Sequence, residues 1–162
     1  MIAYVDTSTF LRAFLPNEVG HREARALIED PPAELALVTG WLTRIEAVAS
    51  VTKRSRHLDQ ARQDAIVAAI ESEFGAAGTV IEILPDADQF EQLRVIANRI
   101  ARQRWVQGPD AIHIASALVI EGMLPELLEA DDDLRLRFVT NDKEQRVAAN
   151  QEGLLVLEPF ET

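Results

Sequence analysis

Four acidic residues occur at positions of the sequence where a charged side chain needs an explanation. Asp6 and Asp142 each follow an apolar run and precede a helical pattern, in MIAYVD and RFVTND. Glu46 lies within an apolar helical pattern, and Asp110 opens the segment PDAIHIASAL. Carboxylates that converge repel one another at neutral pH, and Mg²⁺ or Mn²⁺ relieves that repulsion by binding their oxygens. Because such ions activate water and neutralise charge on phosphoryl groups, the pattern indicates metal-dependent attack of water on a phosphodiester or phosphate.

Three of these acids also have a purely structural explanation. Asp and Asn side chains cap helix starts, so Asp6, Asn141 or Asp142 could serve only as N-caps. An acidic residue in a first helical turn suits the helix dipole, which would account for Asp110. His113 follows Asp110 by one turn, and a histidine at such a position is more often packed or solvated than a metal ligand. Both explanations stay open for each acid at this point.

Glu46 poses a different question because of its neighbours. In the helical segment Trp41–Lys53 we expect an apolar stripe through Leu42, Ile45 and Ala49, with Glu46 lying on it. A carboxylate that faces a core is costly unless it is paired or binds a metal ion. The structural alternative for Glu46 is therefore a buried ion pair.

Short apolar runs alternate with helical patterns along the chain. The predicted strands are Ile2–Val5, Leu35–Val38, Val80–Leu84, Phe138–Thr140 and Leu154–Leu157. The predicted helices are Ser8–Phe14, Arg22–Ile28, Trp41–Lys53, Leu58–Phe74, Ala87–Arg104, Asp110–Glu121 and Asp142–Gln151. This alternation predicts an α/β fold with a parallel sheet covered on both faces. Sites in such sheets form beyond the carboxyl ends of the strands, where these acids would meet.

The composition is that of one globular domain covering residues 1–162. The chain has 48% hydrophobic residues and no cysteine, so disulfides and thiolate metal sites are excluded. No membrane span or signal peptide is visible, and we expect a cytoplasmic protein. The net charge of −11 argues against broad, charge-driven nucleic-acid binding. It does not exclude a nucleic-acid enzyme whose negative charge is concentrated where metal ions bind.

The motifs that contain the four acids resemble the PIN-domain ribonucleases, and most closely the VapC-type toxins of bacterial toxin–antitoxin pairs. The matching pieces are VDTSTFL, TRIEAVAS, PDAIHIASAL and FVTNDKEQRVAANQEGLLVLEP, and together they extend over nearly the whole chain. The resemblance implies a central parallel sheet of about five strands between helices. It also implies Mg²⁺- or Mn²⁺-dependent endonucleolytic cleavage of RNA that leaves a 5′-phosphate, without a covalent nucleophile.

The resemblance also implies the roles of particular residues and the partners. The residues that match the family's catalytic and metal-binding acids are Asp6, Glu46, Asp110 and Asp142. Ser8 and Thr140 match polar positions that support the carboxylates or water, and Asn141 could assist. The partners implied are an RNA substrate, a second copy of the chain in a homodimer, and a small VapB-like antitoxin that wraps the toxin. The antitoxin typically places a basic side chain near the acidic site.

Two features depart from the simplest members of that family. The segment Leu124–Arg137 is expected to be a longer loop, and we interpret Asp131–Asp133 within it as solvated. The negative net charge would require local cations to guide RNA. Arg12 and the Arg99–Arg104 cluster are the candidates, while basic clusters in general are more often solvated helix faces and ends.

Other functions fit the sequence less well. An aspartate-nucleophile phosphatase would need a second aspartate where Ser8 stands, and no glycine-rich nucleotide-binding motif follows a strand. A receiver-type switch would need an acidic pair at the first strand, which DTST lacks. The remaining alternative is a catalytically silent PIN-like module that binds an antitoxin or RNA, in which the acids are caps and ion pairs.

Overall fold

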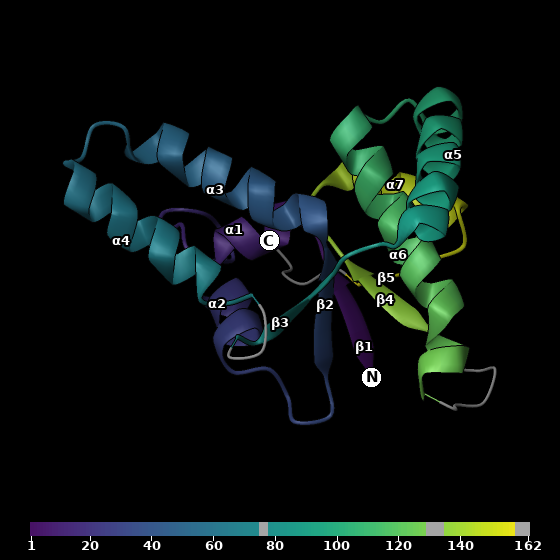
Figure 1. The fold of residues 1–162 in the computed structure, drawn as a ribbon. Helices are drawn as coiled ribbons and strands as arrows, with labels where there is room; N and C mark the ends of the chain where they lie inside the picture. The colour runs from purple at the N-terminus through teal and green to yellow at the C-terminus, as the bar shows by residue number, and fades with distance from the viewer. Residues whose placement is uncertain (75–77, 129–134, 158–162) are drawn as a thin grey trace.

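A five-stranded parallel sheet lies between two layers of helices (Figure 1). The computed structural model describes residues 1–74, 78–128 and 135–157. The strands are β1 (Ile2–Val5), β2 (Ala36–Gly40), β3 (Val80–Ile83), β4 (Leu136–Val139) and β5 (Leu155–Leu157). They pair in the order β3-β2-β1-β4-β5, and every pairing is parallel. The predicted α/β fold is therefore confirmed.

Seven helices are present in the described part of the chain. They are α1 (Thr7–Arg12), α2 (His21–Glu29), α3 (Trp41–Ser55), α4 (Gln60–Glu71), α5 (Ala87–Arg104), α6 (Gly108–Leu128) and α7 (Lys143–Gln151). Helices α1 to α4 contribute to one hydrophobic core and α5 to α7 to the other. Helices α3 and α4 lie side by side and extend away from the sheet as an arm (Figure 1). No described helix is long and apolar enough to span a membrane.

The central strand β1 shows how the sequence forms both cores. Its side chains alternate between the two faces of the sheet, as in any strand. Ile2 and Tyr4 join the core under α5 to α7, whereas Ala3 and Val5 join the core under α1 to α4. All four residues are buried, which explains why this strand is a continuous apolar run.

The strand order makes the end of β1 the expected place for a site. From β1 the chain builds β2 and β3 on one side and then returns to build β4 and β5 on the other. The order therefore reverses between β1 and β4, the position where parallel α/β sheets bind ligands. Val5 is in register with Val139, so Asp6 and Thr140 leave the sheet side by side.

The largest departure from the predicted elements is the length of α6. The helix predicted at Asp110–Glu121 begins earlier and continues to Leu128, with Pro125 inside it. The expected loop starting at Leu124 is therefore wrong in its first part, because Leu124 is buried in the core as a helical residue. Asp131–Asp133 lie outside the described residues. The other elements occur in the predicted order with their ends displaced by a few residues.

Candidate active site

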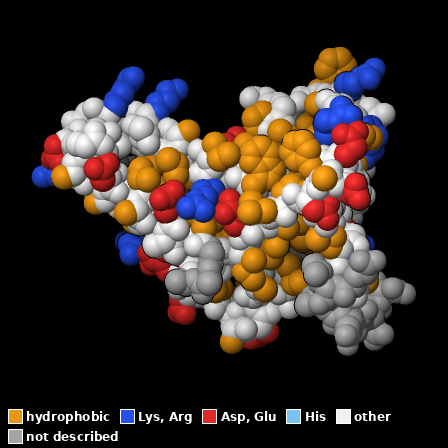
Figure 2. Space-filling view, viewed as in Figure 1, with side chains coloured by type: hydrophobic (Ala, Val, Ile, Leu, Met, Phe, Trp, Pro, Cys, Tyr) orange, Lys and Arg blue, Asp and Glu red, His pale blue; other side chains and the backbone are white. Residues whose placement is uncertain are grey.

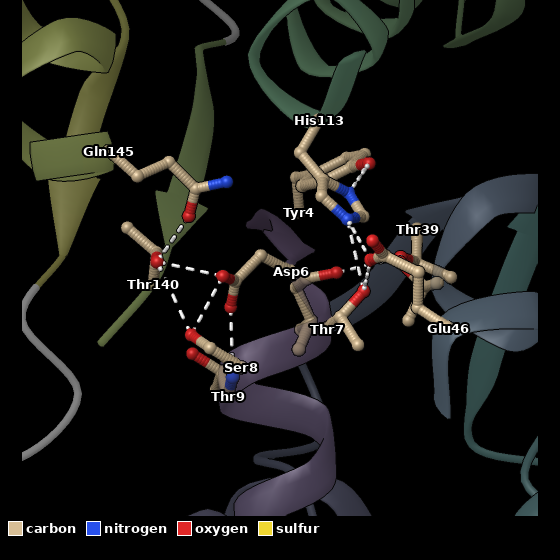
Figure 3. Close-up of polar contacts among 12 residues, drawn as sticks. Tyr4, Asp6, Thr7, Ser8, Thr9, Thr39, Glu46, His113, Thr140 and Gln145 are labelled. Carbon is tan, nitrogen blue, oxygen red and sulfur yellow. Dashed lines mark hydrogen bonds and ion pairs between the residues drawn. The ribbon is translucent and has the colours of Figure 1, made fainter. Parts of the chain in front are cut away.

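Asp6 is buried at the end of β1 and is held by three hydrogen bonds. Its side chain is the N-cap of α1, because Oδ1 accepts from the backbone N–H of Thr9 at 2.9 Å. The other oxygen, Oδ2, accepts from Ser8 Oγ at 2.7 Å and from Thr140 Oγ1 at 2.8 Å (Figure 3). Asp6 is only 2% exposed. The cap explanation is therefore correct but incomplete, since a cap needs one oxygen and the second is oriented by two hydroxyl groups.

Glu46 does not lie on a core-facing stripe, so that prediction is wrong. The core side of α3 consists of Thr43, Ala47 and Val51, whereas Ile45 is 56% exposed. The buried side of the helix therefore carries small or β-branched residues, while Ile45 faces outward. Glu46 is half-buried at the edge between these sides, and it has no Lys or Arg partner among the described residues.

A chain of hydrogen bonds that begins in the buried interior holds Glu46 (Figure 3). His113 Nε2 lies 2.9 Å from Glu46 Oε2, and Nδ1 of the same ring lies 3.0 Å from the hydroxyl of Tyr4. Thr7 Oγ1 donates to Glu46 Oε2 at 2.5 Å and lies 3.0 Å from His113 Nε2. Both ring nitrogens of His113 are thus occupied, and this side chain is packed as expected.

The protonation of the two ends limits the direction of this chain. Burial raises the pKa of Tyr4, so its hydroxyl keeps its proton and can donate to His113 Nδ1. Burial also raises the pKa of Glu46, but hydrogen bonds from His113 and Thr7 and the nearby imidazole outweigh it and lower the pKa below the ordinary value. The carboxylate of Glu46 is therefore ionised and accepts from Nε2–H.

Gly40 allows Tyr4 to reach this position. A Cβ atom at Gly40 would lie 3.0 Å from the Tyr4 hydroxyl oxygen and 3.1 Å from Ser116 Oγ, closer than ordinary packing permits. The absence of a side chain between β2 and α3 therefore leaves room for the hydroxyl that orients His113.

Asp142 and Asp110 begin the remaining two helices of the site. Asp142 is the N-cap of α7, and its Oδ1 accepts from the backbone N–H of Gln145 at 2.8 Å. Asp110 lies in the first turn of α6. Its pKa is raised, first by burial and next by the charge of Asp142; Asp6 and Glu46 add to this rise and His113 opposes it. The four acids thus act on one another's charge, as expected when carboxylates converge.

One cavity of about 550 Å³ collects these side chains. Its lining includes Asp6, Glu46, Asp110 and Asp142, together with Thr7, Ser8 and His113. Within residues 1–74, 78–128 and 135–157, no three His, Asp or Glu side chains already surround a point where a metal ion could bind. The donor set still suits a hard cation, because four carboxylates share a polar cavity and Mg²⁺ commonly keeps several waters between itself and its protein ligands.

Thr140 and Asn141 support Asp6 and its neighbours from outside the lining of the cavity. Thr140 is buried, and its Oγ1 accepts from the backbone N–H of Asp142 at 3.1 Å in addition to donating to Asp6. Asn141 Nδ2 donates to Thr9 Oγ1 at 3.2 Å. Sequence analysis missed Tyr4 and Thr7. The only sequence signal for Thr7 was its place in the hydroxyl-rich stretch DTST.

The basic residues proposed to guide RNA differ in their surroundings. Arg12 lines the acidic cavity, as does Arg54. Arg99 and Arg104 instead bind the carboxylate of Glu152, at 2.5 and 2.8 Å. The Glu152 side chain is only 3% exposed, and it offsets one of the three positive charges of the Arg99–Arg104 cluster.

Comparison with known proteins finds a protein family whose model matches this chain and solved structures that share its fold. The family model described as PIN domain matches residues 3–150. Among solved structures, FitAcB from Neisseria gonorrhoeae superposes with a TM-score of 0.56 at 17% identity, covering 98% of each chain. A toxin–antitoxin complex from Klebsiella pneumoniae gives a TM-score of 0.56 at 18% identity over 99% of each chain.

A third similar structure is VapC20 from Mycobacterium tuberculosis, described as a sarcin-ricin loop cleaving toxin. It superposes with a TM-score of 0.55 at 18% identity, covering 90% of this chain and 94% of that one. At these identities the likeness establishes the fold. No curated protein gives a significant match to the sequence.

Proposed function

Since this chain belongs to the PIN domain family, we propose that it is a metal-dependent endoribonuclease and the toxin of a VapC-type toxin–antitoxin pair. The observation that carries this proposal is the convergence of four carboxylates on one cavity at the ends of β1 and β4. The raised pKa of Asp110 supports it, because burial and then the charges of Asp142, Asp6 and Glu46 raise it. Structures with the same fold are described as a toxin–antitoxin complex and as a sarcin-ricin loop cleaving toxin.

In this proposal Asp6, Glu46, Asp110 and Asp142 hold one or two Mg²⁺ or Mn²⁺ ions. When bound, the metal supplies a nucleophilic water and stabilises negative charge on the phosphoryl oxygens. Ser8 and Thr140 fix the Asp6 carboxylate, so little reorganisation is needed when the site fills. His113 does not act as a base toward substrate, because both of its ring nitrogens are engaged with protein groups.

Two partners belong to the same proposal. A small VapB-like antitoxin would hold the toxin inactive by covering the acidic cavity, and the toxin would form a homodimer. The cavity suits an antitoxin that inserts a basic side chain, because four carboxylates line it and the other three acids influence the pKa of Asp110. A catalytically silent module that binds an antitoxin or RNA is the competing function, and it would not need metal.

Metal removal gives the direct test of the proposed reaction. We expect purified, antitoxin-free protein to cleave a mixed RNA pool in Mg²⁺ or Mn²⁺, to lose this activity in EDTA, and to regain it when Mn²⁺ is restored. The fragments should carry 5′-phosphates. Mn²⁺ should also raise the melting temperature, since a ligand present at a hundred times its Kd stabilises a fold by about 2.7 kcal/mol. No cleavage together with no Mn²⁺ binding in calorimetry would contradict the proposal and favour the silent module.

His113 should act as a positioning residue for Glu46. His113→Phe removes the donor to Glu46 and leaves the Tyr4 hydroxyl without its acceptor. Losing such a supporting partner typically weakens metal binding by about 10–100-fold. We expect a loss of that size in Mn²⁺ calorimetry, with a folded protein by circular dichroism. Tyr4→Phe should cause a smaller loss, because Nε2–H can still reach Glu46; equal Mn²⁺ affinity in all three proteins would show that the chain is only structural.

A further inference from the structure

Trp105, one of the two tryptophans in the chain, has an unusually exposed side chain. It lies between α5 and α6 and is 90% exposed, although tryptophan is normally well buried in folded proteins. Figure 2 shows hydrophobic and basic side chains together at the upper right of this face, over the region where Figure 1 places α5. No ring contact involves Trp105 in the described residues. Packing therefore does not explain this residue.

The backbone holds Trp105 outward. It is the C-cap of α5 with φ of 59°, in the left-handed region, where glycine or asparagine would cost less free energy. The next residue, Val106, is buried and anchors the connection to the core. The chain thus presents a rigid indole at a position where the fold itself would favour a small residue. Unfavourable backbone conformations of this kind are found more often at functional sites.

Trp105 is close to two of the site acids in the sequence and lines a cavity of its own. The cavity, of about 620 Å³, is bounded by Trp105, Gln103 and Arg104 from one side and by Lys143, Glu144 and Val147 of α7 from the other. Lys143 directly follows Asp142, and Trp105 precedes Asp110 by five residues. Lys143 has no ion-pair partner within the described ranges. The exposed ring of Trp105 and the ammonium group of Lys143 are therefore close in sequence to Asp110 and Asp142, at the starts of α6 and α7.

We propose that Trp105 and Lys143 form a nucleotide-binding subsite for single-stranded RNA, in which a base stacks on the indole and a phosphate binds the ammonium group. This inference rests on the proposed function and names how its substrate is held. Aromatic side chains bind single-stranded bases by stacking, and lysine contacts the backbone without sequence preference. The cavity lining is mostly charged or amide residues, which fits RNA better than a protein partner, because charged residues are depleted at the centre of protein interfaces.

Binding to intact RNA tests this subsite without cleavage. The background is Asp6→Asn in Mg²⁺, and the probe is an oligouridylate of about 10 nucleotides, within the usual span of such sites. We expect the probe to quench tryptophan fluorescence, and the quench to fall sharply in Trp105→Phe, which leaves only Trp41. With a fluorescein-labelled probe, Trp105→Ala should weaken binding about tenfold, and Trp105→Phe should retain most of the affinity. Lys143→Gln should make the fall of log binding constant with log salt concentration shallower, by about 0.7 in slope.

Phe90→Ala is the matched control, because Phe90 is an exposed aromatic residue near the opposite end of α5. It should bind the probe like the background protein. The subsite is overturned if Trp105→Ala and Phe90→Ala bind equally, or if Trp105→Phe binds as weakly as Trp105→Ala. It is also overturned if Trp105→Ala changes only the sedimentation of the protein, which would assign Trp105 to a second copy of the chain. Cleavage by protein with Asp6 intact is scored separately, so a failed nuclease and a failed subsite are distinguishable.

Discussion

Asp6→Asn should abolish metal-dependent RNA cleavage while leaving the protein folded. Removing the charge takes away the carboxylate that Ser8 and Thr140 hold in place. Loss of one preorganised electrostatic group costs about 10²–10³ in rate, and the loss of a metal ligand should reach at least the upper end of that range. We expect cleavage in Mn²⁺ to fall by about 10³-fold or more, measured with the wild-type RNA fragments as the standard.

The fold should survive this change because its hydrogen bonds can be reassigned. Asparagine caps helices as well as aspartate does, so the bond from the Thr9 N–H is kept. The new amide can donate to Thr140 Oγ1, which can then donate its proton to Gln145 Oε1, 2.5 Å away. The cost in stability should be about 1 kcal/mol, the scale of one neutral hydrogen bond.

Asp86→Asn is the control that separates a cap from a catalytic residue. Asp86 caps α5 by the same kind of bond, from the backbone N–H of Gln89, but it is exposed and outside the acidic cavity. This variant should keep full cleavage activity. If Asp6→Asn retained activity to the same degree, Asp6 would be only a helix cap and the proposed site would be wrong.

The fold was predictable because its signals are local. Asp6 and Asp142 follow apolar strands and cap the next helix, and both features lie within a few consecutive residues. Parallel strands then bring such positions to one edge of the sheet without further information. The length of α6 was less predictable. Tertiary burial of Leu124 keeps a helix going through Pro125, where the local sequence favours its end.

The surroundings of Glu46 could not be predicted in the same way. The hydrophobic pattern predicted that Leu42, Ile45 and Ala49 face the core, whereas the buried side of α3 carries Thr43 and Ala47. A helix pattern cannot distinguish an apolar side that faces the core from one left at the surface. The bonds from Thr7 and His113 to Glu46 join residues 39 and 67 positions apart, and only the folded chain brings them together.

Without metal, the Asp110→Asn variant should be more stable than wild type. With metal bound, it should be less stable than wild type. The folded state raises the pKa of Asp110, so at neutral pH its ionised form opposes folding. Stability is lost as pH rises from the ordinary carboxyl pKa of about 3.9 through the raised folded value. Asparagine removes this charge with little change in shape. After allowance for solvent screening, we expect a gain of about 1 kcal/mol at pH 7, or a few degrees in melting temperature.

The pH and metal dependence of that gain identify its cause. Near pH 3 the wild-type carboxyl is protonated, so the two proteins should melt at nearly the same temperature. In saturating Mn²⁺ the order should reverse, because wild type binds the ion with one more carboxylate and is stabilised by mass action. Scanning calorimetry at both pH values, with EDTA or Mn²⁺, gives the four comparisons needed.

Asp88→Asn distinguishes this site effect from the helix dipole. Asp88 occupies the first turn of α5 as Asp110 occupies that of α6, but it is exposed and lies outside the acidic cavity. Removing a favourable charge at a helix start should cost about 0.3–1 kcal/mol. In EDTA, changes in melting temperature of opposite sign for Asp88→Asn and Asp110→Asn would mean that Asp110 is held in an electrostatically unfavourable place. A residue that serves only the helix has no reason to occupy such a place, whereas a metal ligand does. If Asp110→Asn lowered the melting temperature as Asp88→Asn does, the dipole would account for Asp110, and the proposed metal site would lose one of its four ligands.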